Sequence, residues 1–266
     1  MPSNTPSRGE LRRFWERQST RFGDFRKALS TDYYRKDEER IIRRVLPERK
    51  NALVMKLDLW NEVKNTNILA WVAGQGYRTV AMDISYSLVR SAQSAFHSCS
   101  LTPRFSVAAL YDLPFRTDCV DVLYTMGTIE HVPDMQRCVR EIYRVMKPGG
   151  TAIIGVPNKH DPFLRPALVW FMNLFDRYPY GLEQSLTRRE LASLLRNEGF
   201  EIIGDDGILF MPGLFRMAEL ALLGRSRILA TAMGALHVPF RLLARLFPRL
   251  SRHGYLIACI GRKPLA

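Results

Sequence analysis

The stretch "ALVMKLDLWNEVKNTNILAWVAGQGYRTVAMDIS", residues 52–85, decides the fold. It begins and ends with an apolar run, residues 52–59 and 78–85, and each run contains an aspartate near its end. The segment between them, residues 61–75, has the length and composition of a helix. A strand, a helix and a second strand in this order predict a βαβ unit of a parallel sheet.

The same alternation continues along the chain. Further strands are expected at 104–110, 120–127, 151–157, 201–210 and 255–261, and further helices at 86–97, 134–146 and after Thr187. Thr187 precedes Glu190 by three residues, which is the spacing of a capping box. At the other end of the chain, apolar residues spaced by three and four predict a helix within 10–29, and a second helix is expected over 32–46.

Length and composition favour one elaborated domain. The chain has 266 residues, of which 47% are hydrophobic, enough for one sizeable core. We predict an N-terminal helical segment, residues 1–50, and a main domain, residues 51–266. Two inserts interrupt the main domain: 158–185, rich in aromatic residues, and 211–253, with short helices broken near Pro239 and Pro248. Together they are expected to form a cap for a substrate.

Charge and cysteine usage narrow the setting of the protein. The net charge of +13 is concentrated in residues 1–50 and 208–253, where arginines alternate with large apolar residues. This favours an anionic interface such as a membrane surface over nucleic acid. The four cysteines form no CxxC pair, and we expect reduced thiols, no metal site and a cytoplasmic location. The N-terminus has no apolar core typical of a secretory signal. The longest uncharged apolar run, 228–240, is too short to span a membrane.

Three motifs identify the class. "DIS" follows the second strand, "DLPF" precedes "DCVDVLYTMGTIEHVPD", and "REIYRVMKPGG" precedes the fifth strand. In combination they resemble class I S-adenosylmethionine-dependent methyltransferases of the type 11 group, which includes quinone C-methylases. The resemblance covers about residues 51–207 and the last strand. It implies a Rossmann-like, mostly parallel seven-stranded α/β sheet with an antiparallel last strand, the cofactor S-adenosylmethionine, and methyl transfer to a nucleophile.

The resemblance also assigns cofactor-binding residues. Asp83 would hold the ribose hydroxyls, although a role in capping the following helix is the structural alternative, with Ser85 competing for it. Asp112 would accept from the adenine amino group, or else cap a turn before a proline. Ile84 and Leu113 neighbour these aspartates, and Thr125 and Gly127 would pass under the cofactor.

The loop after the first strand departs from the family pattern. Residues 56–67, "KLDLWNEVKNTN", contain no glycine, and Trp60 and Glu62 lie near positions where the family has glycine. The loop nevertheless offers groups for the two charges of a methionine moiety. We expect Asp58 to meet the amino group, and Lys56 to contact the carboxylate or to serve a structural role. Either the pocket has been rebuilt or it has degenerated.

Candidate catalytic and substrate-binding residues lie beyond the strand ends. Methyl transfer depends mainly on positioning, and a general base is required only where the acceptor loses a proton. Glu130, His131 and His160 are the candidate catalytic groups. Asp161, Trp170 and Tyr180 are the candidate substrate contacts, although an aromatic residue in the insert is more often packed in a core.

Three functions remain open at this stage. The sequence favours an S-adenosylmethionine-dependent methyltransferase that acts on a hydrophobic or lipid-linked small molecule. A catalytically inactive relative that serves as a membrane-peripheral or partner-binding protein is the second possibility, and an RNA methyltransferase is the third. The segment "PFRLLARLFPRLSRHG", residues 239–254, is amphipathic and basic. Such a face either packs on its own domain or lies at the cytoplasmic surface of an anionic membrane.

Overall fold

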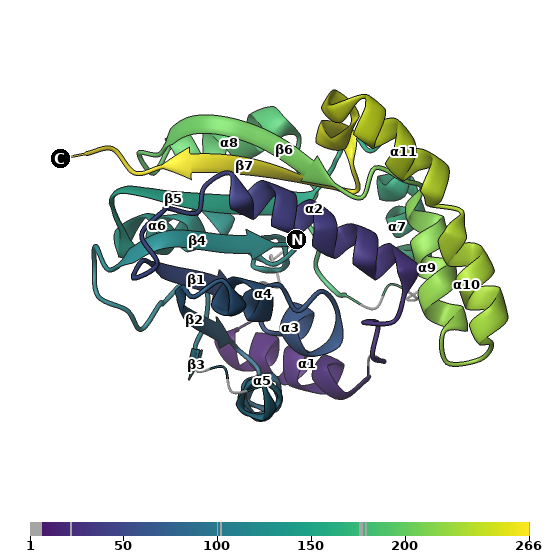
Figure 1. Ribbon diagram of the computed structural model, residues 1–266, viewed down its shortest axis with the longest axis horizontal. Helices are drawn as coiled ribbons and strands as arrows, with labels where there is room; N and C mark the ends of the chain where they lie inside the picture. Colours follow the sequence, from purple (N-terminus) through teal and green to yellow (C-terminus); the bar gives the residue numbers. More distant parts are fainter. Residues whose placement is uncertain are drawn as a thin grey trace.

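The protein forms one seven-stranded sheet with helices on both faces (Figure 1). The structure is a computed structural model, and it describes residues 7–265 apart from 22, 100, 102, 176, 177 and 179. The strands are β1 (Leu53–Leu57), β2 (Arg78–Asp83), β3 (Arg104–Val107), β4 (Val120–Met126), β5 (Met146–Pro157), β6 (Glu201–Ile208) and β7 (Leu256–Arg262). Their order in the sheet is β3-β2-β1-β4-β5-β7-β6.

The strand directions match the predicted fold class. β1 to β5 are parallel to one another, whereas β7 is antiparallel to both of its neighbours, β5 and β6. The strand order reverses between β1 and β4, because the chain moves outward from β1 to β3 and then returns to β4 on the other side. In doubly wound sheets, ligands bind at the carboxyl ends of the strands beside such a reversal. The fold prediction is therefore confirmed.

Alternate residues of each central strand face opposite layers of helices. In β4, Leu123 packs in a core with α6 (Met135–Val145) and α8 (Arg188–Arg196). Its neighbours Val122 and Tyr124 pack in a second core with α2 (Leu29–Arg43) and α4 (Ile68–Gly74). A third, smaller core lies under α5 (Tyr86–Ser98).

Two of the predicted helices have different bounds. The helix expected over 61–75 is two short helices, α3 (Trp60–Lys64) and α4, because Asn67 adopts a left-handed conformation with φ +53° between them. The helix expected within 10–29 is α1 (Arg8–Arg21), and Leu29 belongs to α2. The capping box of Thr187 and Glu190 at the start of α8 is confirmed.

The two inserts add helices beside one end of the sheet (Figure 1). The first contains α7 (Arg165–Leu174). The second contains α9 (Gly213–Leu222), α10 (Arg227–Ala235), α11 (Val238–Leu246) and the 3₁₀ segment η2 (Pro248–His253). The expected breaks are confirmed, since Pro239 lies in the first turn of α11 and Pro248 begins η2. Among the helices formed by the described residues, none has the length and apolar character needed to cross a membrane.

Candidate functional site

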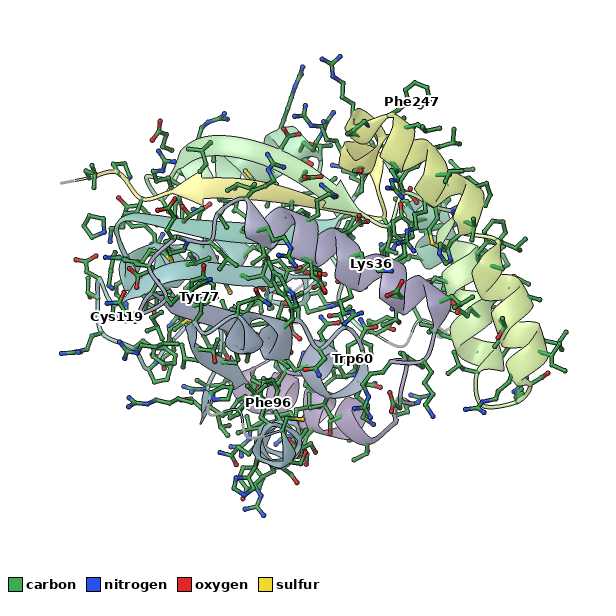
Figure 2. The ribbon with its side chains drawn as sticks, viewed as in Figure 1. Lys36, Trp60, Tyr77, Phe96, Cys119 and Phe247 are labelled. Atoms are coloured by element: carbon green, nitrogen blue, oxygen red, sulfur yellow. The ribbon has the colours of Figure 1, made fainter. Side chains whose placement is uncertain are left out.

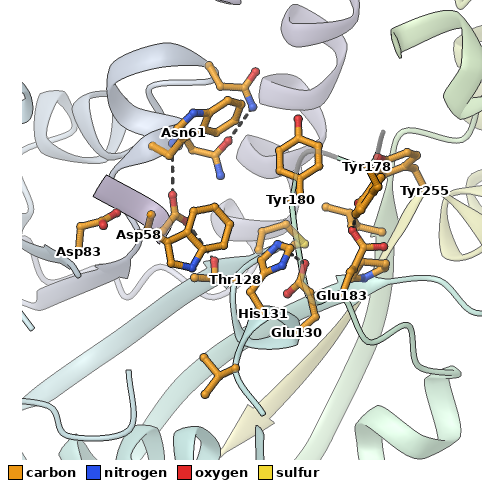
Figure 3. Close-up of a pocket in the computed structure, with 18 of the residues that line it drawn as sticks. Asp58, Asn61, Asp83, Thr128, Glu130, His131, Tyr178, Tyr180, Glu183 and Tyr255 are labelled. Carbon is orange, nitrogen blue, oxygen red and sulfur yellow. Dashed lines mark hydrogen bonds and ion pairs between the residues drawn. The ribbon is translucent and has the colours of Figure 1, made fainter. Parts of the chain in front are cut away.

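A cavity of about 430 Å³ lies at the carboxyl ends of the central strands (Figure 3). Its volume is within the range of small-molecule sites. The strands contribute Asp83, Gly127 and Pro157, which end or follow β2, β4 and β5. Helices of the N-terminal segment and of both inserts complete the wall, so that segments far apart in the sequence enclose one space.

Asp83 is a buried carboxylate on this wall, 8% exposed. One of its oxygens accepts a hydrogen bond from the backbone N–H of Leu59 and the other from that of Ser85, both at 2.8 Å. Ser85 itself caps α5 by accepting from the N–H of Leu88, so Asp83 does not cap the helix directly. Burial raises the pKa of Asp83 to about 7. Its carboxyl retains lone pairs that a hydroxyl of a ligand can use.

The glycine-free loop folds around Asp58, which has φ +95°. A positive φ is rare in residues other than glycine, so Asp58 adopts the type of backbone conformation that glycine usually provides. Its carboxylate accepts from the N–H of Asn61 at 3.2 Å, from Lys56 at 2.8 Å and from the hydroxyl of Thr128 at 3.2 Å. Figure 3 shows Asp58 and Asn61 on one side of the cavity. The loop thus presents a fixed carboxylate to the cavity.

A cluster of buried charged side chains includes and contacts residues of this loop. Lys56, 1% exposed, lies 2.8 Å from Asp58 and 3.8 Å from Glu62. Burial works against the charge of Lys56, but the three carboxylates of Asp58, Glu62 and Glu38 outweigh it and raise its pKa. Burial also raises the pKa of Glu62 to about 8 and that of Glu38 to about 7. Lys56 is not part of the cavity wall, so its position is structural.

Trp60 and Glu62, which we expected to lie near positions where the family has glycine, point in different directions. Glu62 is directed into the buried cluster, where it accepts from the N–H of Leu69 at 2.8 Å. The Trp60 indole belongs to the cavity wall and packs edge-on against Phe25, with ring centroids 5.9 Å apart. The cavity retains its volume beside the indole. Trp60 therefore lines the cavity and Glu62 lies outside it, so neither side chain fills the cavity.

Glu130 and His131 form a second polar group on the wall, in the 3₁₀ turn η1 (Ile129–His131). Burial raises the pKa of Glu130 well above its usual value, and one of its oxygens has no hydrogen-bond partner among the described residues. Nδ1 of His131 lies 2.6 Å from the carbonyl oxygen of Leu182. A carbonyl only accepts, so Nδ1 carries the proton and Nε2 retains its lone pair. Burial lowers the pKa of His131, which keeps this imidazole neutral at neutral pH.

An ion pair closes the far side of the cavity. Arg165, at the start of α7, binds Glu183 through two hydrogen bonds of 2.6 and 2.8 Å, and Tyr178 also donates to Glu183. The Arg165 guanidinium lies over the ring of Tyr255 at 4.3 Å. Burial alone would raise the pKa of Glu183, but Arg165 lowers it. The charges of this pair are thus compensated within the protein.

Seven of the thirteen predicted site residues line the cavity: Asp58, Asp83, Ile84, Gly127, Glu130, His131 and Tyr180. Gly127 has φ +73°, which favours glycine there. Burial raises the pKa of Tyr180 to about 12. The roles assigned to these residues remain predictions.

The other six predicted residues do not line the cavity. Asp112 is exposed and pairs with Arg8 at 3.2 Å, and His160 and Trp170 are also exposed. Leu113 and Thr125 are buried in the protein, where the Thr125 hydroxyl approaches the carbonyl of Leu57.

Asp161, the sixth of these residues, accepts from the backbone N–H groups of Phe163 and Arg165 and so supports the start of α7. Carboxylates and histidines next to strand ends can satisfy local backbone or surface partners, and sequence spacing does not distinguish the two cases.

Sequence reasoning missed Arg216 on α9, which lines the cavity and is 8% exposed. The available signal was a helix, 213–222, whose only charged residues are Arg216 and Glu219. Their spacing of three suggests a surface ion pair. Instead, Glu219 accepts from the backbone N–H groups of Leu29 and Ser30 at the start of α2.

Comparisons with known proteins agree with this geometry. Residues 64–154 match a family described as methyltransferase domain, and the match begins within the glycine-free loop, residues 56–67. The chain is 27% identical over 145 residues to the ubiquinone biosynthesis O-methyltransferase of Xanthomonas oryzae pv. oryzae (strain PXO99A), a match that covers 53% of this chain and 61% of that protein. The chain thus spans less than two thirds of this relative.

Solved structures share the fold at low sequence identity. A complex of the Haloferax volcanii Trm112 methyltransferase activator with a methyltransferase matches with a TM-score of 0.63, 17% identity, and coverage of 96% of this chain and 98% of that chain. The cyclase SpnF matches with a TM-score of 0.62, 14% identity and 98% coverage of both chains. The sequence of residues 64–154 thus resembles the methyltransferase domain family, and the chain shares its fold with solved methyltransferases. S-adenosylmethionine is the cofactor of such methyltransferases, and a relative from Mycolicibacterium smegmatis (strain ATCC 700084 / mc(2)155) is named a probable S-adenosylmethionine-dependent methyltransferase; it is 27% identical over 145 residues, 54% of this chain and 51% of that protein.

Proposed function

We propose that the protein transfers a methyl group from S-adenosylmethionine to a hydrophobic small molecule. The observation that carries this proposal is the cavity of about 430 Å³ at the carboxyl ends of the strands, with buried carboxylates on its wall. The rebuilt loop leaves this space open, which fits a working site better than a degenerate one. When bound, the cofactor supplies a methyl group on a positively charged sulfur.

The residues present fit the cofactor. Asp83 would accept hydrogen bonds from the ribose hydroxyls, and Asp58 would accept hydrogen bonds from the ammonium of the methionine portion. At Gly127 the absence of a side chain allows close approach of a ligand. The predicted contact of Asp112 with the adenine is the weakest of these proposals, because its carboxylate pairs with Arg8 at the surface.

His131 is our candidate for the general base. An acceptor such as a phenol must lose its proton during methylation, and a neutral imidazole with a free Nε2 can take it. Nε2 lies 3.8 Å from Glu130. Because the pKa of Glu130 is raised and that of His131 is lowered, the neighbouring carboxyl holds a proton while the imidazole remains free to accept one.

The inserts supply an apolar part of the cavity wall. Two helices, α7 and α9, contribute five apolar side chains: Val169, Met172, Met217, Leu220 and Ala221. Apolar walls with a few polar groups are typical of sites for hydrophobic ligands. The name of the Xanthomonas relative refers to ubiquinone biosynthesis, and this supports a quinone-like acceptor.

The outer face of the inserts suggests where such an acceptor comes from. Exposed apolar side chains occur on α7 and directly after it, on α10 and α11, and in the turn after α11: Trp170, Phe171, Phe175, Ile228, Leu242, Leu246 and Phe247. Figure 2 shows Phe247 on the outer side of this region. Arg245 and Arg249 lie in the same basic segment. We propose that this face lies on an anionic membrane, with the apolar residues in the interface.

Vesicle sedimentation tests the membrane proposal. The protein should sediment with vesicles that contain phosphatidylglycerol at low salt, and about 0.5 M salt should release it, because salt screens the attraction of the arginines. Replacing Leu246 and Phe247 by serine should weaken the binding. Absence of sedimentation at low salt would remove the membrane from the proposal and leave the methyltransferase part intact.

A second candidate function is a protein of the same fold that transfers no methyl group. Two observations favour keeping it: the loop without glycine, and the likeness in fold to SpnF, whose title names a cyclase. A shared fold does not define the reaction.

Calorimetric titration with S-adenosylhomocysteine separates the two candidates. The methyltransferase proposal requires binding, and Asp83→Ala should weaken it by about tenfold or more, since hydrogen bonds to a charged group contribute about 1.5–3 kcal/mol. Asp121→Ala is the matched control. Asp121 is also buried and accepts a backbone N–H, that of Leu53, but it lies at the opposite end of the sheet. Failure of the native chain to bind would refute the proposed function.

A further inference from the structure

Arg216 is a buried cation on the cavity wall whose partners are all neutral. Its Nη1 donates to the hydroxyls of Ser30 and Thr31 at 2.8 and 3.2 Å, and its Nη2 donates to the side-chain oxygen of Asn65 at 3.0 Å. The guanidinium also lies 5.5 Å from the centre of the Tyr34 ring. These contacts orient the side chain but leave its charge uncompensated.

Two acidic residues of the insert helices and the cavity wall, Glu219 and Glu183, have partners other than Arg216. Glu219, one turn away on α9, caps the start of α2, and Glu183 is paired with Arg165. A buried charge without a counterion is costly, and proteins normally pair it. A guanidinium has five N–H donors, and three of these bonds are made within the described residues. Two donors remain, enough for a bidentate bond to a carboxylate.

A chain of hydrogen bonds connects Arg216 to Asp58. Asn65, which accepts from Arg216, donates to the side chain of Asn61 at 2.6 Å, and the backbone N–H of Asn61 donates to Asp58 at 3.2 Å. All four residues line the cavity, and Figure 3 shows the link between Asn61 and Asp58. A positive group on α9 and a negative group on the loop that lacks glycine are thus connected along the wall of the same cavity.

We propose that Arg216 binds the α-carboxylate of the methionine portion of S-adenosylmethionine, while Asp58 accepts the ammonium of the same portion. This inference rests on the proposed function. An amino acid carries both charges on neighbouring atoms, and the pair of fixed, opposite charges matches it. The arginine of the insert between β6 and β7 then does what backbone N–H groups of a glycine-rich loop would do. It follows that the second insert takes part in cofactor binding and is not only a cap over the acceptor.

Two ligands that differ in one group test the inference. S-adenosylhomocysteine carries both charges, whereas its decarboxylated analogue retains the amine and lacks the carboxylate. Their dissociation constants are measured by calorimetry for the native chain and for Arg216→Gln. The native chain should bind S-adenosylhomocysteine about 10-fold to 100-fold more tightly than the analogue. Arg216→Gln should bind the two with nearly equal affinity.

The ratio of the two affinities distinguishes recognition from general damage to the fold, which would weaken both ligands alike. Arg165→Gln is the matched control: it removes a buried arginine from the same cavity and should leave the ratio unchanged. If Arg216→Gln does not fold, Arg216→Lys, which keeps the charge but not the planar fork, should reduce the ratio.

Each result bears on one claim. A native chain that binds both ligands equally, or a ratio that survives in the Arg216 variants, overturns the inference while leaving the proposed function in place. A native chain that binds neither ligand refutes the proposed function and this inference with it.

Discussion

Replacing Glu62 by glutamine tests how the charge cluster under the glycine-free loop is held together. Lys56 lies 2.8 Å from Asp58 but 3.8 Å from Glu62, so its single charge compensates Asp58 first. Glu62 is buried, and burial raises its pKa to about 8 from an ordinary 4.5, so we expect it to hold a proton at neutral pH. Glutamine resembles this protonated form and can still accept from the N–H of Leu69.

The size of the effect follows from the two pKa values. A raised pKa in the folded state adds stability that is fully present below pH 4.5 and is lost as the pH rises toward 8, since the unfolded chain releases its proton earlier. Each pH unit in this window corresponds to about 1.4 kcal/mol. At pH 5 the native chain and Glu62→Gln should therefore have similar free energies of unfolding. At pH 7 the variant should be more stable by an amount on the order of 3 kcal/mol.

Urea unfolding followed by circular dichroism at pH 5, 6, 7 and 8 measures this difference. The native chain itself should lose stability over the same range, because burial also raises the pKa of Glu38 and Asp83 to about 7. The comparison with Glu62→Gln isolates one group. A difference that stays constant from pH 5 to pH 8 would contradict the reasoning, and would mean that Glu62 is ionised and paired with Lys56 in the folded protein.

Three further substitutions have defined outcomes. Gly155→Ala places a Cβ 2.0 Å from the sulfur of Met126, so overpacking should lower the free energy of unfolding by about 1–3 kcal/mol, measurable by urea titration. Glu190→Gln removes a carboxylate that accepts a hydrogen bond from the backbone N–H of Thr187, and this bond lowers the pKa of Glu190 to about 2. The native chain's advantage over this variant should be present at pH 6 and should disappear as the pH falls from 4.5 to 2, visible in thermal unfolding. Arg8→Ala removes an exposed ion pair with Asp112, and its melting temperature should match that of the native chain, since such pairs contribute about 0–1 kcal/mol.

Local pattern was sufficient to predict the fold. Apolar runs such as 52–59 and 151–157 form strands because their side chains can be buried on both faces of a parallel sheet. The breaks at Pro239 and Pro248 and the capping box at Thr187 were also predictable, because each depends on interactions within a few residues. The break between α3 and α4 was not, since Asn67 takes a left-handed conformation that no pattern in the segment required.

The sequence by itself determined that carboxylates such as Asp58 and Asp83 end neighbouring strands and meet at one edge of the sheet. Only the tertiary structure decided which charges are compensated there. Arg216 and Glu219 are neighbours on one helix, yet one faces the cavity and the other caps a helix that begins 190 positions earlier in the chain. Burial and charge compensation depend on which distant segments come together, and this is why the sequence alone did not indicate that Arg216 lines the cavity.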